Sequence, residues 1–453
     1  MVVIETFRAA LDSGVTTSRS LVENCLERAT PASGEGSRTF VHLFADAARA
    51  EADAIDRRRR AGIWTGWLGG IPVSVKDLFD IRGLPTTAGS IVLADAPAAA
   101  QDAVVVERLR AAGGVIIGRT NMTEFAFSGL GLNPHYGTPA NPFDRPARRI
   151  PGGSSSGAAV SICDEMAVAA IGTDTGGSVR IPAAFCGLTG FKPTAARVPL
   201  AGVLPLSKSL DSVGPLGRSV MCCRILDAVL SGQRPDPAPP VDLRGLRIAV
   251  PTTRVFDEIE SHVARTFETA IATIADAGAL ISRIAVPEFE EVGQAAQVAT
   301  FPAAEGFAWH RELLARAKDR YDPRVAERLE RGRQIGAADY LWLVRRRGEL
   351  IAGMRARAAQ FDLLAMPTVP ITAPAIADLE RDGELYHRLN LLALRNPTLI
   401  NFLDGCALSL PCHREGEAPV GLMLARFDGA DGTILAIGEA IEAALAVVRR
   451  GDN

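Results

Sequence analysis

The sequence predicts an α/β protein in which helices pack against a layered β-sheet, and three observations support this fold class. Segments with helical spacing of apolar residues alternate with short apolar strands. The chain has 453 residues, of which 47% are hydrophobic, so it can bury a large core. No internal repeat or long low-complexity tract interrupts the pattern. We therefore expect one compact domain over residues 1–453.

The first half of the chain supplies most of this alternation. Thr17 or Ser18 can cap a helix that runs to about Arg28, and residues 45–60 are rich in Ala, Glu and Arg with helical periodicity. The other elements expected in this half are a strand over 71–76, a helix over 104–112, a strand over 115–118 and a small-residue helix over 158–170.

The second half continues in the same way. Apolar runs predict strands at 247–250 and 363–366, and residues 432–449 have the spacing of a final amphipathic helix. The proline-rich stretch 231–240 could separate two domains, but it also fits a surface excursion within one domain, which we favour.

Charge, hydropathy and cysteine content exclude several classes of protein. A formal net charge of −3 gives no electrostatic reason to expect a nucleic acid or a membrane surface as a partner. No stretch approaches the roughly 18 uninterrupted apolar residues of a membrane span, and no basic region with a hydrophobic segment opens the chain. We therefore expect a cytoplasmic protein. The seven cysteines are scattered without Cys-x-x-Cys spacing, which favours reduced thiols over a metal site.

The basic residues of this chain are almost all arginines. Of the 49 basic residues only four are lysines. A guanidinium does not lose its proton in a protein, whereas a buried ammonium can. The lysines are therefore candidate chemical groups. They are Lys76, Lys192, Lys208 and Lys318.

Two segments rich in glycine and serine could place a hydroxyl beside free backbone N–H groups. Pro-Gly-Gly-Ser-Ser-Ser-Gly at 151–157 puts a serine at the start of the expected small-residue helix, although a flexible connector or a helix cap explains it equally well. Gly-Thr-Asp-Thr-Gly-Gly-Ser at 172–178 is more specific, because two glycines before Ser178 let consecutive N–H groups converge on one point. An ordinary tight turn is the alternative for this second segment.

A serine nucleophile needs a base, and the sequence favours a lysine over a histidine. Lys76 follows an apolar strand, where burial would lower its pKa and leave some neutral amine at physiological pH. The histidines stand in helical or loop contexts without the motif of a base. They are His42, His135, His262, His310, His387 and His413. The residues therefore predict a Ser-Lys arrangement.

The Lys76 strand and the segments 151–157 and 172–178 resemble the amidase signature enzymes in order and spacing. Connecting segments of the chain are also similar to this family, so the strong resemblance covers about residues 69–217. It implies a large central mixed β-sheet covered by helices on both faces, with variable substrate-pocket helices at about 289–360. It implies no metal or other cofactor.

The resemblance implies a catalytic triad. Ser178 would be the nucleophile, Ser154 a bridging serine in a cis peptide, and Lys76 the base. Neutral Lys76 would take a proton from Ser154, which takes one from Ser178 as the latter attacks the carbonyl carbon. The reverse relay would protonate the leaving amine.

The resemblance also implies the groups around this triad. The oxyanion hole would consist of the backbone N–H groups of Thr175, Gly176, Gly177 and Ser178. Four residues would support the network, namely Ser156, Thr173, Asp174 and Arg180. Relatives that bind small carboxylated substrates place an arginine one position after Arg180, where this chain has Ile181, so we expect no carboxylate site at Arg180.

In this family the acyl pocket is built largely from the loop at 125–136 and the C-terminal helices. The apolar and aromatic residues of that loop predict a small apolar or aryl-containing amide as the substrate, and a urea-type amide remains open; the residues include Phe125, Phe127, Leu130, Leu132 and Tyr136. The alternative is that these side chains belong to the core.

Four functions remain open from the sequence. We favour a stand-alone amidase that acts on a small-molecule amide, as a monomer or a homodimer. The A subunit of a glutamyl-tRNA(Gln) amidotransferase shares the catalytic core, although the segment 129–135 and the helical region after residue 290 fit it less well. A thiol amidase of the nitrilase type would use Cys163 or Cys186. A non-catalytic binding role is the fourth alternative.

Overall fold

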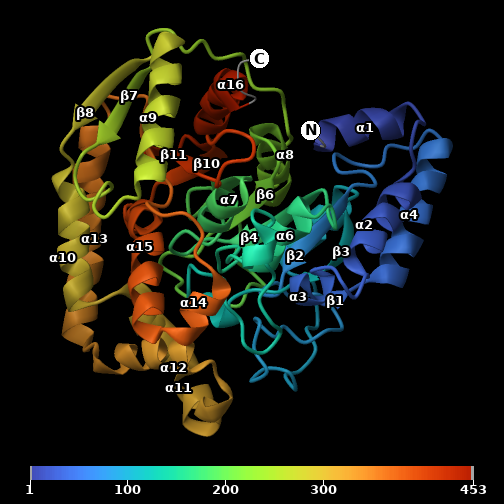
Figure 1. The fold of residues 1–453 in the computed structure, drawn as a ribbon. Helices are drawn as coiled ribbons and strands as arrows, with labels where there is room; N and C mark the ends of the chain where they lie inside the picture. The colour runs from blue at the N-terminus through green and yellow to red at the C-terminus, as the bar shows by residue number, and fades with distance from the viewer. Residues whose placement is uncertain (1–2, 450–453) are drawn as a thin grey trace.

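The computed structural model describes residues 3–449, which form a mixed eleven-stranded sheet with helices on both faces (Figure 1). The strand order is β1-β3-β2-β4-β6-β5-β10-β11-β9-β7-β8. The strands are β1 (Phe40–Leu43), β2 (Pro72–Lys76), β3 (Val115–Thr120), β4 (Ala169–Thr173), β5 (Thr189–Lys192), β6 (Val213–Gly217), β7 (Arg247–Pro251), β8 (Leu280–Ile284), β9 (Leu363–Pro367), β10 (Cys406–Pro411) and β11 (Gly421–Arg426).

The helices occupy most of the sequence between the strands. The α-helices are α1 (Ile4–Asp12), α2 (Ser18–Ala29), α3 (Gly36–Thr39), α4 (Ala45–Arg60), α5 (Val104–Ala111), α6 (Ser156–Cys163), α7 (Arg180–Cys186), α8 (Val220–Ser231), α9 (Ser261–Asp276), α10 (Pro287–Val298), α11 (Phe301–Ala317), α12 (Pro323–Glu330), α13 (Ala337–Ala358), α14 (Ile376–Arg381), α15 (Gly383–Phe402) and α16 (Asp431–Arg449). Short 3₁₀ helices are η1 (Glu124–Ala126), η2 (Arg145–Ala147), η3 (Lys318–Arg320) and η4 (Arg331–Gln334).

The sheet is mixed, as expected. The strand β2 lies between β3 and β4 and is parallel to both, and β7 is parallel to β8 and β9. The other pairs, including the β5–β10 pair that joins the two halves of the chain, are antiparallel. Parallel strands buried on both faces explain the continuous apolar runs in the sequence.

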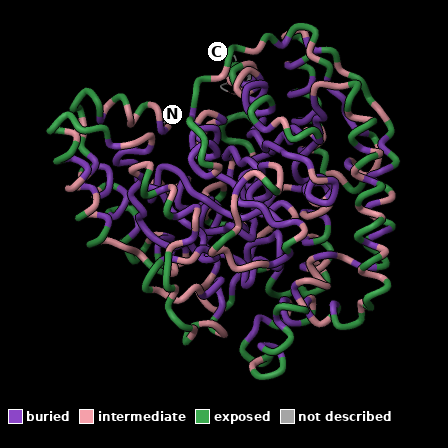
Figure 2. Tube along the Cα trace, turned by 180° about the vertical axis from the view of Figure 1, so that it is seen from behind, coloured by how far each residue is buried: buried purple, intermediate pink, exposed green. Residues whose placement is uncertain are grey.

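Alternate residues of the C-terminal strands pack against different helices, because successive side chains of a strand point to opposite faces. Ile248 and Val250 belong to a core cluster with α9 and α16. Ala249, between them, belongs to a second cluster with α10, α13 and α15. Buried residues accordingly concentrate along the sheet, and exposed residues follow the outer helices and loops (Figure 2). Within residues 3–449, no helix has the length and apolar character needed to cross a membrane.

Most of the predicted elements are confirmed to within a few residues. The helix α2 begins at Ser18, and the Thr17 side chain accepts a hydrogen bond from the Ser20 N–H, as a capping residue should. The helix expected at 432–449 runs from Asp431 to Arg449. The stretch 231–240 is an excursion with mostly exposed residues between α8 and β7.

The small-residue helix expected over 158–170 is wrong in its second half. It ends at Cys163, and residues 169–173 form the buried strand β4. Glu165, in the connecting turn, has a φ of 57°, which a helix cannot continue through. Pairing with β2 and β6 overrides the helix propensity of the alanines, because position in a sheet outweighs a weak local preference.

Candidate active site

Two neighbouring parallel strands bring the first candidate residues together. Lys76 ends β2 and Thr173 ends β4, and these strands pair in register from Val73 with Ala169 to Val75 with Ile171. The carboxyl ends of both strands therefore lie at the same edge of the sheet. This is the region where open α/β sheets commonly place ligand sites.

The Lys76 ammonium group is held by two hydroxyl groups. Its Nζ lies 2.7 Å from Ser154 Oγ and 2.8 Å from Thr173 Oγ1. Lys76 and Ser154 are fully buried. The peptide bond between Gly153 and Ser154 is cis, as the family resemblance implies. The structure thus brings Lys76, Ser154 and Thr173 into direct contact, although they are far apart in the sequence.

The environment of Lys76 favours the neutral amine. Burial lowers the pKa of Lys76 to about 7, and the nearby carboxylates of Asp174 and Asp211 only partly oppose this shift. Desolvation penalises the charged form of a lysine, which is why the direction is downward. A substantial fraction of Lys76 is therefore neutral near pH 7 and able to accept a proton.

Ser178 lies in the same buried region and contacts the residue that follows Ser154. The backbone N–H of Ser155 donates to the Ser178 carbonyl at 3.3 Å, which ties the two serine segments together. Only 3% of Ser178 is exposed. Within the part of the chain that the structure describes, the Ser178 hydroxyl makes no hydrogen bond, so it is free to turn toward a neighbouring acceptor or a bound molecule.

The loop that carries Ser178 presents free backbone donors. Among residues 3–449, the N–H groups of Thr175, Gly176 and Ser178 have no hydrogen-bond partner. Gly177 differs from the expectation, because its N–H donates to Asp174 Oδ1 at 2.8 Å and is already occupied. The position requires a glycine. Its φ is 120°, which side chains rarely adopt, and a Cβ there would lie 2.5 Å from Pro397 Cβ.

A buried ion pair between Asp174 and Arg180 fixes the conformation of this loop. The Arg180 Nη2 and Nε atoms lie 2.9 and 3.0 Å from the two carboxylate oxygens of Asp174, and both residues are fully buried. Burial alone raises the pKa of the Asp174 carboxyl, but Arg180 outweighs that effect, and the pKa lies well below its usual range. The Asp174 carboxylate also accepts from the Val179 N–H, so it holds both ends of the turn.

Two residues that hold the loop escaped the sequence analysis. Asn401, on α15, donates to Asp174 Oδ1 at 2.9 Å and accepts from Arg180 at 2.5 Å. Asp211 accepts from Thr175 Oγ1 at 2.5 Å. No local pattern in the sequence indicates Asn401, whereas Asp211 lies just before β6 within the resembling region 69–217.

The two serines after Ser154 make different contacts. The Ser156 hydroxyl donates to the Asn121 carbonyl at 3.4 Å, in a neighbouring loop. The Ser155 N–H donates to the Ser178 carbonyl, and its hydroxyl donates to the Thr173 carbonyl at 3.5 Å. The supporting role expected of Ser156 stays a prediction, and Ser155 contacts the Ser178 segment directly.

The aromatic residues expected in the substrate pocket have different environments. Phe125 is 1% exposed, and its ring centroid lies 4.3 Å from that of His310 within a core cluster. Phe127 is also buried, and the Arg328 guanidinium lies 4.9 Å above its ring. Tyr136 is partly buried. The alternative that these side chains belong to the core therefore fits Phe125 best.

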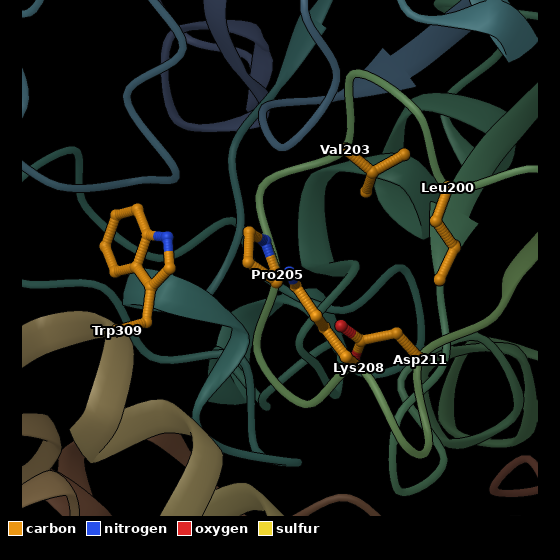
Figure 3. A pocket seen from close by; sticks show the side chains of 6 residues that line it. All are labelled: Leu200, Val203, Pro205, Lys208, Asp211 and Trp309. Carbon is orange, nitrogen blue, oxygen red and sulfur yellow. The ribbon is translucent and has the colours of Figure 1, made fainter.

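A cavity of about 470 Å³ adjoins the site (Figure 3). Asp211, which bonds to Thr175, is one of its walls. Five further residues line it, namely Leu200, Val203, Pro205, Lys208 and Trp309. None of the three aromatic residues expected in the pocket lines this cavity.

The cysteines do not support a thiol nucleophile. Burial raises the pKa of the Cys186 thiol well above its ordinary value, and its Sγ donates to the Pro151 carbonyl. Cys163 Sγ donates to the Cys186 carbonyl. A thiolate is the reactive form of cysteine, so this environment opposes a thiol mechanism.

The loop histidine His135 contacts Glu124, with 2.8 Å between its Nε2 and the Glu124 Oε1. In the described residues, no group of His, Cys, Asp and Glu could hold a metal ion.

Known proteins share this sequence and fold. The sequence profile of the family described as Amidase matches residues 20–435. A "2-amino-5-chloromuconic acid deaminase" from Comamonas testosteroni is 39% identical over 87% of this chain and 86% of the relative. The A subunit of the glutamyl-tRNA(Gln) amidotransferase from Chloroflexus aurantiacus is 34% identical over 96% of this chain and 95% of the relative. A solved structure described as "Crystal structure of amidase" has a TM-score of 0.86 at 33% identity, over 98% of this chain and 99% of that one.

The family profile, the relatives and the matching structure indicate the same class of protein. The chain is a hydrolase that acts on the carbon–nitrogen bonds of amides. The match to the family profile extends over nearly the whole chain. The chain belongs to the amidase family, the amidase signature enzymes. The expected fold class and the expected activity class are thereby confirmed.

Proposed function

We propose that this chain hydrolyses a small amide to a carboxylic acid and ammonia or an amine, through an acyl intermediate on Ser178. The observation that carries the proposal is the buried contact between Lys76 and Ser154, with the free hydroxyl of Ser178 next to it. A serine hydroxyl is a weak nucleophile unless a neighbouring base removes its proton. A lysine whose pKa is about 7 can be that base at physiological pH.

The first half of the reaction forms the acyl enzyme. Ser178 Oγ attacks the carbonyl carbon of the amide, its proton moves to Ser154 Oγ, and the Ser154 proton moves to Lys76 Nζ. The carbonyl oxygen gains negative charge and is stabilised by the free N–H groups of the 175–178 loop, a contribution of about 3 kcal/mol per donor in serine hydrolases. The protons then return along the same relay to the nitrogen, the C–N bond breaks, and the amine leaves.

The second half regenerates the enzyme. A water molecule loses a proton to the relay as its oxygen attacks the acyl carbon, and the bond to Ser178 Oγ breaks as that oxygen regains a proton. Thr173 keeps Lys76 Nζ beside Ser154 through both halves. Asp174 and Arg180 do not exchange protons in this scheme; they fix the shape of the loop.

Ammonia release from a panel of primary amides and ureas tests this proposal. We expect Ser178→Ala and Lys76→Ala to lose at least about 10⁴-fold in kcat/KM, because removing one member of such a relay disables the whole of it. Lys318→Ala is the matched control, since Lys318 lies on the surface and pairs with Glu330. Near-full activity of Lys76→Ala at neutral pH would contradict the proposed base.

A second candidate is the A subunit of a glutamyl-tRNA(Gln) amidotransferase, which the 34% identity to that protein from Chloroflexus aurantiacus favours. Such a chain would release ammonia from glutamine only together with partner subunits and charged tRNA. The stand-alone amidase instead requires that the isolated chain turns over at least one amide of the panel. Turnover restricted to the complex with tRNA would decide for the second candidate.

A further inference from the structure

The cavity beside the site contains a lysine that the proposed mechanism does not use. Lys208 is one of four lysines in a chain with 49 basic residues, and its side chain lies on the wall of this cavity (Figure 3). Lys318 pairs with Glu330 at 3.5 Å, whereas no carboxylate in the described part of the chain lies within 4.0 Å of Lys208 Nζ. A cation at a cavity without an internal partner is available to an anionic ligand.

The loop around Lys208 is fixed in place by a carboxylate from α11. Glu305 accepts hydrogen bonds from Ser207 Oγ at 2.7 Å and from the Ser209 N–H at 3.1 Å. It also accepts from the Ser209 hydroxyl and from Tyr340. The residues on both sides of Lys208 are therefore anchored, and its side chain starts from a defined backbone position.

Asp211 is the acidic residue of the cavity lining, and its carboxylate accepts hydrogen bonds from the two loops beside it. Its Oδ2 accepts from the Leu206 and Ser207 N–H groups at 3.0 Å each, and its Oδ1 accepts from Thr175 Oγ1. Burial raises the pKa of Asp211 to about 6. These donors hold the Asp211 carboxylate in the loops, and neither of its oxygens lies within 4.0 Å of Lys208 Nζ.

The rest of the cavity is apolar and includes a flat aromatic ring. Trp309, on α11, is 38% exposed and lies across from the loop that carries Lys208. Leu200, Val203 and Pro205 complete the lining. Thr175 links the cavity to the proposed oxyanion loop through its bond to Asp211. The cavity thus holds a cation and an apolar surface, and its wall residue Asp211 contacts the loop of the proposed reaction site directly.

We propose that this cavity is a subsite for a substrate carboxylate, with Lys208 as its cationic partner and Trp309 against the carbon chain. The substrate class is then an amide whose acyl part ends in a carboxylate, that is, a monoamide of a dicarboxylic acid. This inference rests on the proposed function, because the acyl carbon must reach Ser178. For a primary amide, the acyl part is the only part that can carry the carboxylate, since the leaving group is ammonia.

The test compares primary monoamides of dicarboxylic acids, from three to eight carbons, with neutral primary amides of equal chain length. The measured quantity is kcat/KM for the monoamide divided by kcat/KM for the neutral amide. We expect Lys208→Gln to lower this ratio by about tenfold or more for the best monoamide, mainly through KM, because the charge contact is lost. Lys208→Arg should keep most of the ratio, and the surface control Lys318→Gln should keep all of it.

A binding experiment separates this inference from the proposed function. Binding of the free dicarboxylates to the Ser178→Ala protein, followed by calorimetry, should weaken about tenfold when Lys208→Gln is added. If amides are turned over but the ratio of kcat/KM for the monoamide to kcat/KM for the neutral amide is the same in the wild type and in Lys208→Gln, the inference is overturned and the proposed function remains. Lys208-dependent binding of dicarboxylates without turnover of any amide would keep the subsite and overturn the proposed function.

Discussion

The Lys76 amine has two opposing influences on its charge. Removing an ammonium group from water disfavours its charged form, and this effect lowers the pKa of Lys76 to about 7 although Asp174 and Asp211 attract the proton. Activity that depends on neutral Lys76 should therefore rise as the pH rises through about 7, because deprotonation increases the fraction of base. Each nearby anion raises this midpoint, so removing one should lower it.

The burial of Lys76 could be predicted from the sequence, because lysine is rare in this chain and this one stands at the end of an apolar strand. Gly177 could be predicted only as a turn residue. The bond from its N–H to Asp174 depends on how the whole loop closes, and a glycine-rich sequence does not specify which N–H groups remain free.

At the scale of elements, the loop after β4 is held by α7 and α15. Arg180 at the start of α7 and Asn401 near the end of α15 both contact the Asp174 carboxylate. Asn401 lies 227 positions away from Asp174 in the sequence, so no local pattern could identify it. The apolar runs of the neighbouring strands are local and predict them, whereas the alanines of β4 predict a helix because alanine favours helices in isolation.

Removal of Arg180 should destabilise the protein strongly. We expect Arg180→Met to lower the free energy of unfolding by about 3–5 kcal/mol, because it leaves the Asp174 carboxylate buried without its cation. Urea unfolding at neutral pH measures this change.

Two further variants identify the cause of that loss. The double variant Asp174→Asn with Arg180→Met should recover part of it, since the uncompensated charge is gone. Arg345→Met, at an arginine whose side chain is 72% exposed, should change the free energy of unfolding by less than about 0.5 kcal/mol. A loss at Arg180 no larger than at Arg345 would contradict this account of the ion pair.

At the scale of the whole molecule, one sheet joins the two halves of the chain. The first six strands form one side and the last five the other, and they meet where β5 pairs with β10. Glu442 of α16 also accepts from the Val220 N–H at the start of α8. We propose on this basis that the chain is a single domain. The sequence predicts the layered class and the proline-rich excursion, but not the strand order, because long-range pairing leaves no periodic trace.

Cleavage of the excursion tests this proposal. A site-specific protease sequence inserted between Asp236 and Pro237, in a mostly exposed stretch, should allow a single cut. We expect the two fragments to remain associated during size-exclusion chromatography in native buffer, because the β5–β10 pair and the helices across it stay buried. The cut protein in urea is the control for complete cleavage. Fragments that separate in native buffer as compact units would show two domains instead.

The pH dependence of kcat/KM in the wild type and in Asp211→Asn tests the central claim most directly, namely that neutral Lys76 activates Ser178 through Ser154. The account predicts a rise with a midpoint near pH 7 in the wild type and a lower midpoint in Asp211→Asn, because one anion that raises the pKa of Lys76 is gone. Asp319→Asn, at an exposed aspartate, should leave the midpoint unchanged. A midpoint that is the same in all three proteins, or a rate that falls as the pH rises through 7, would contradict the claim.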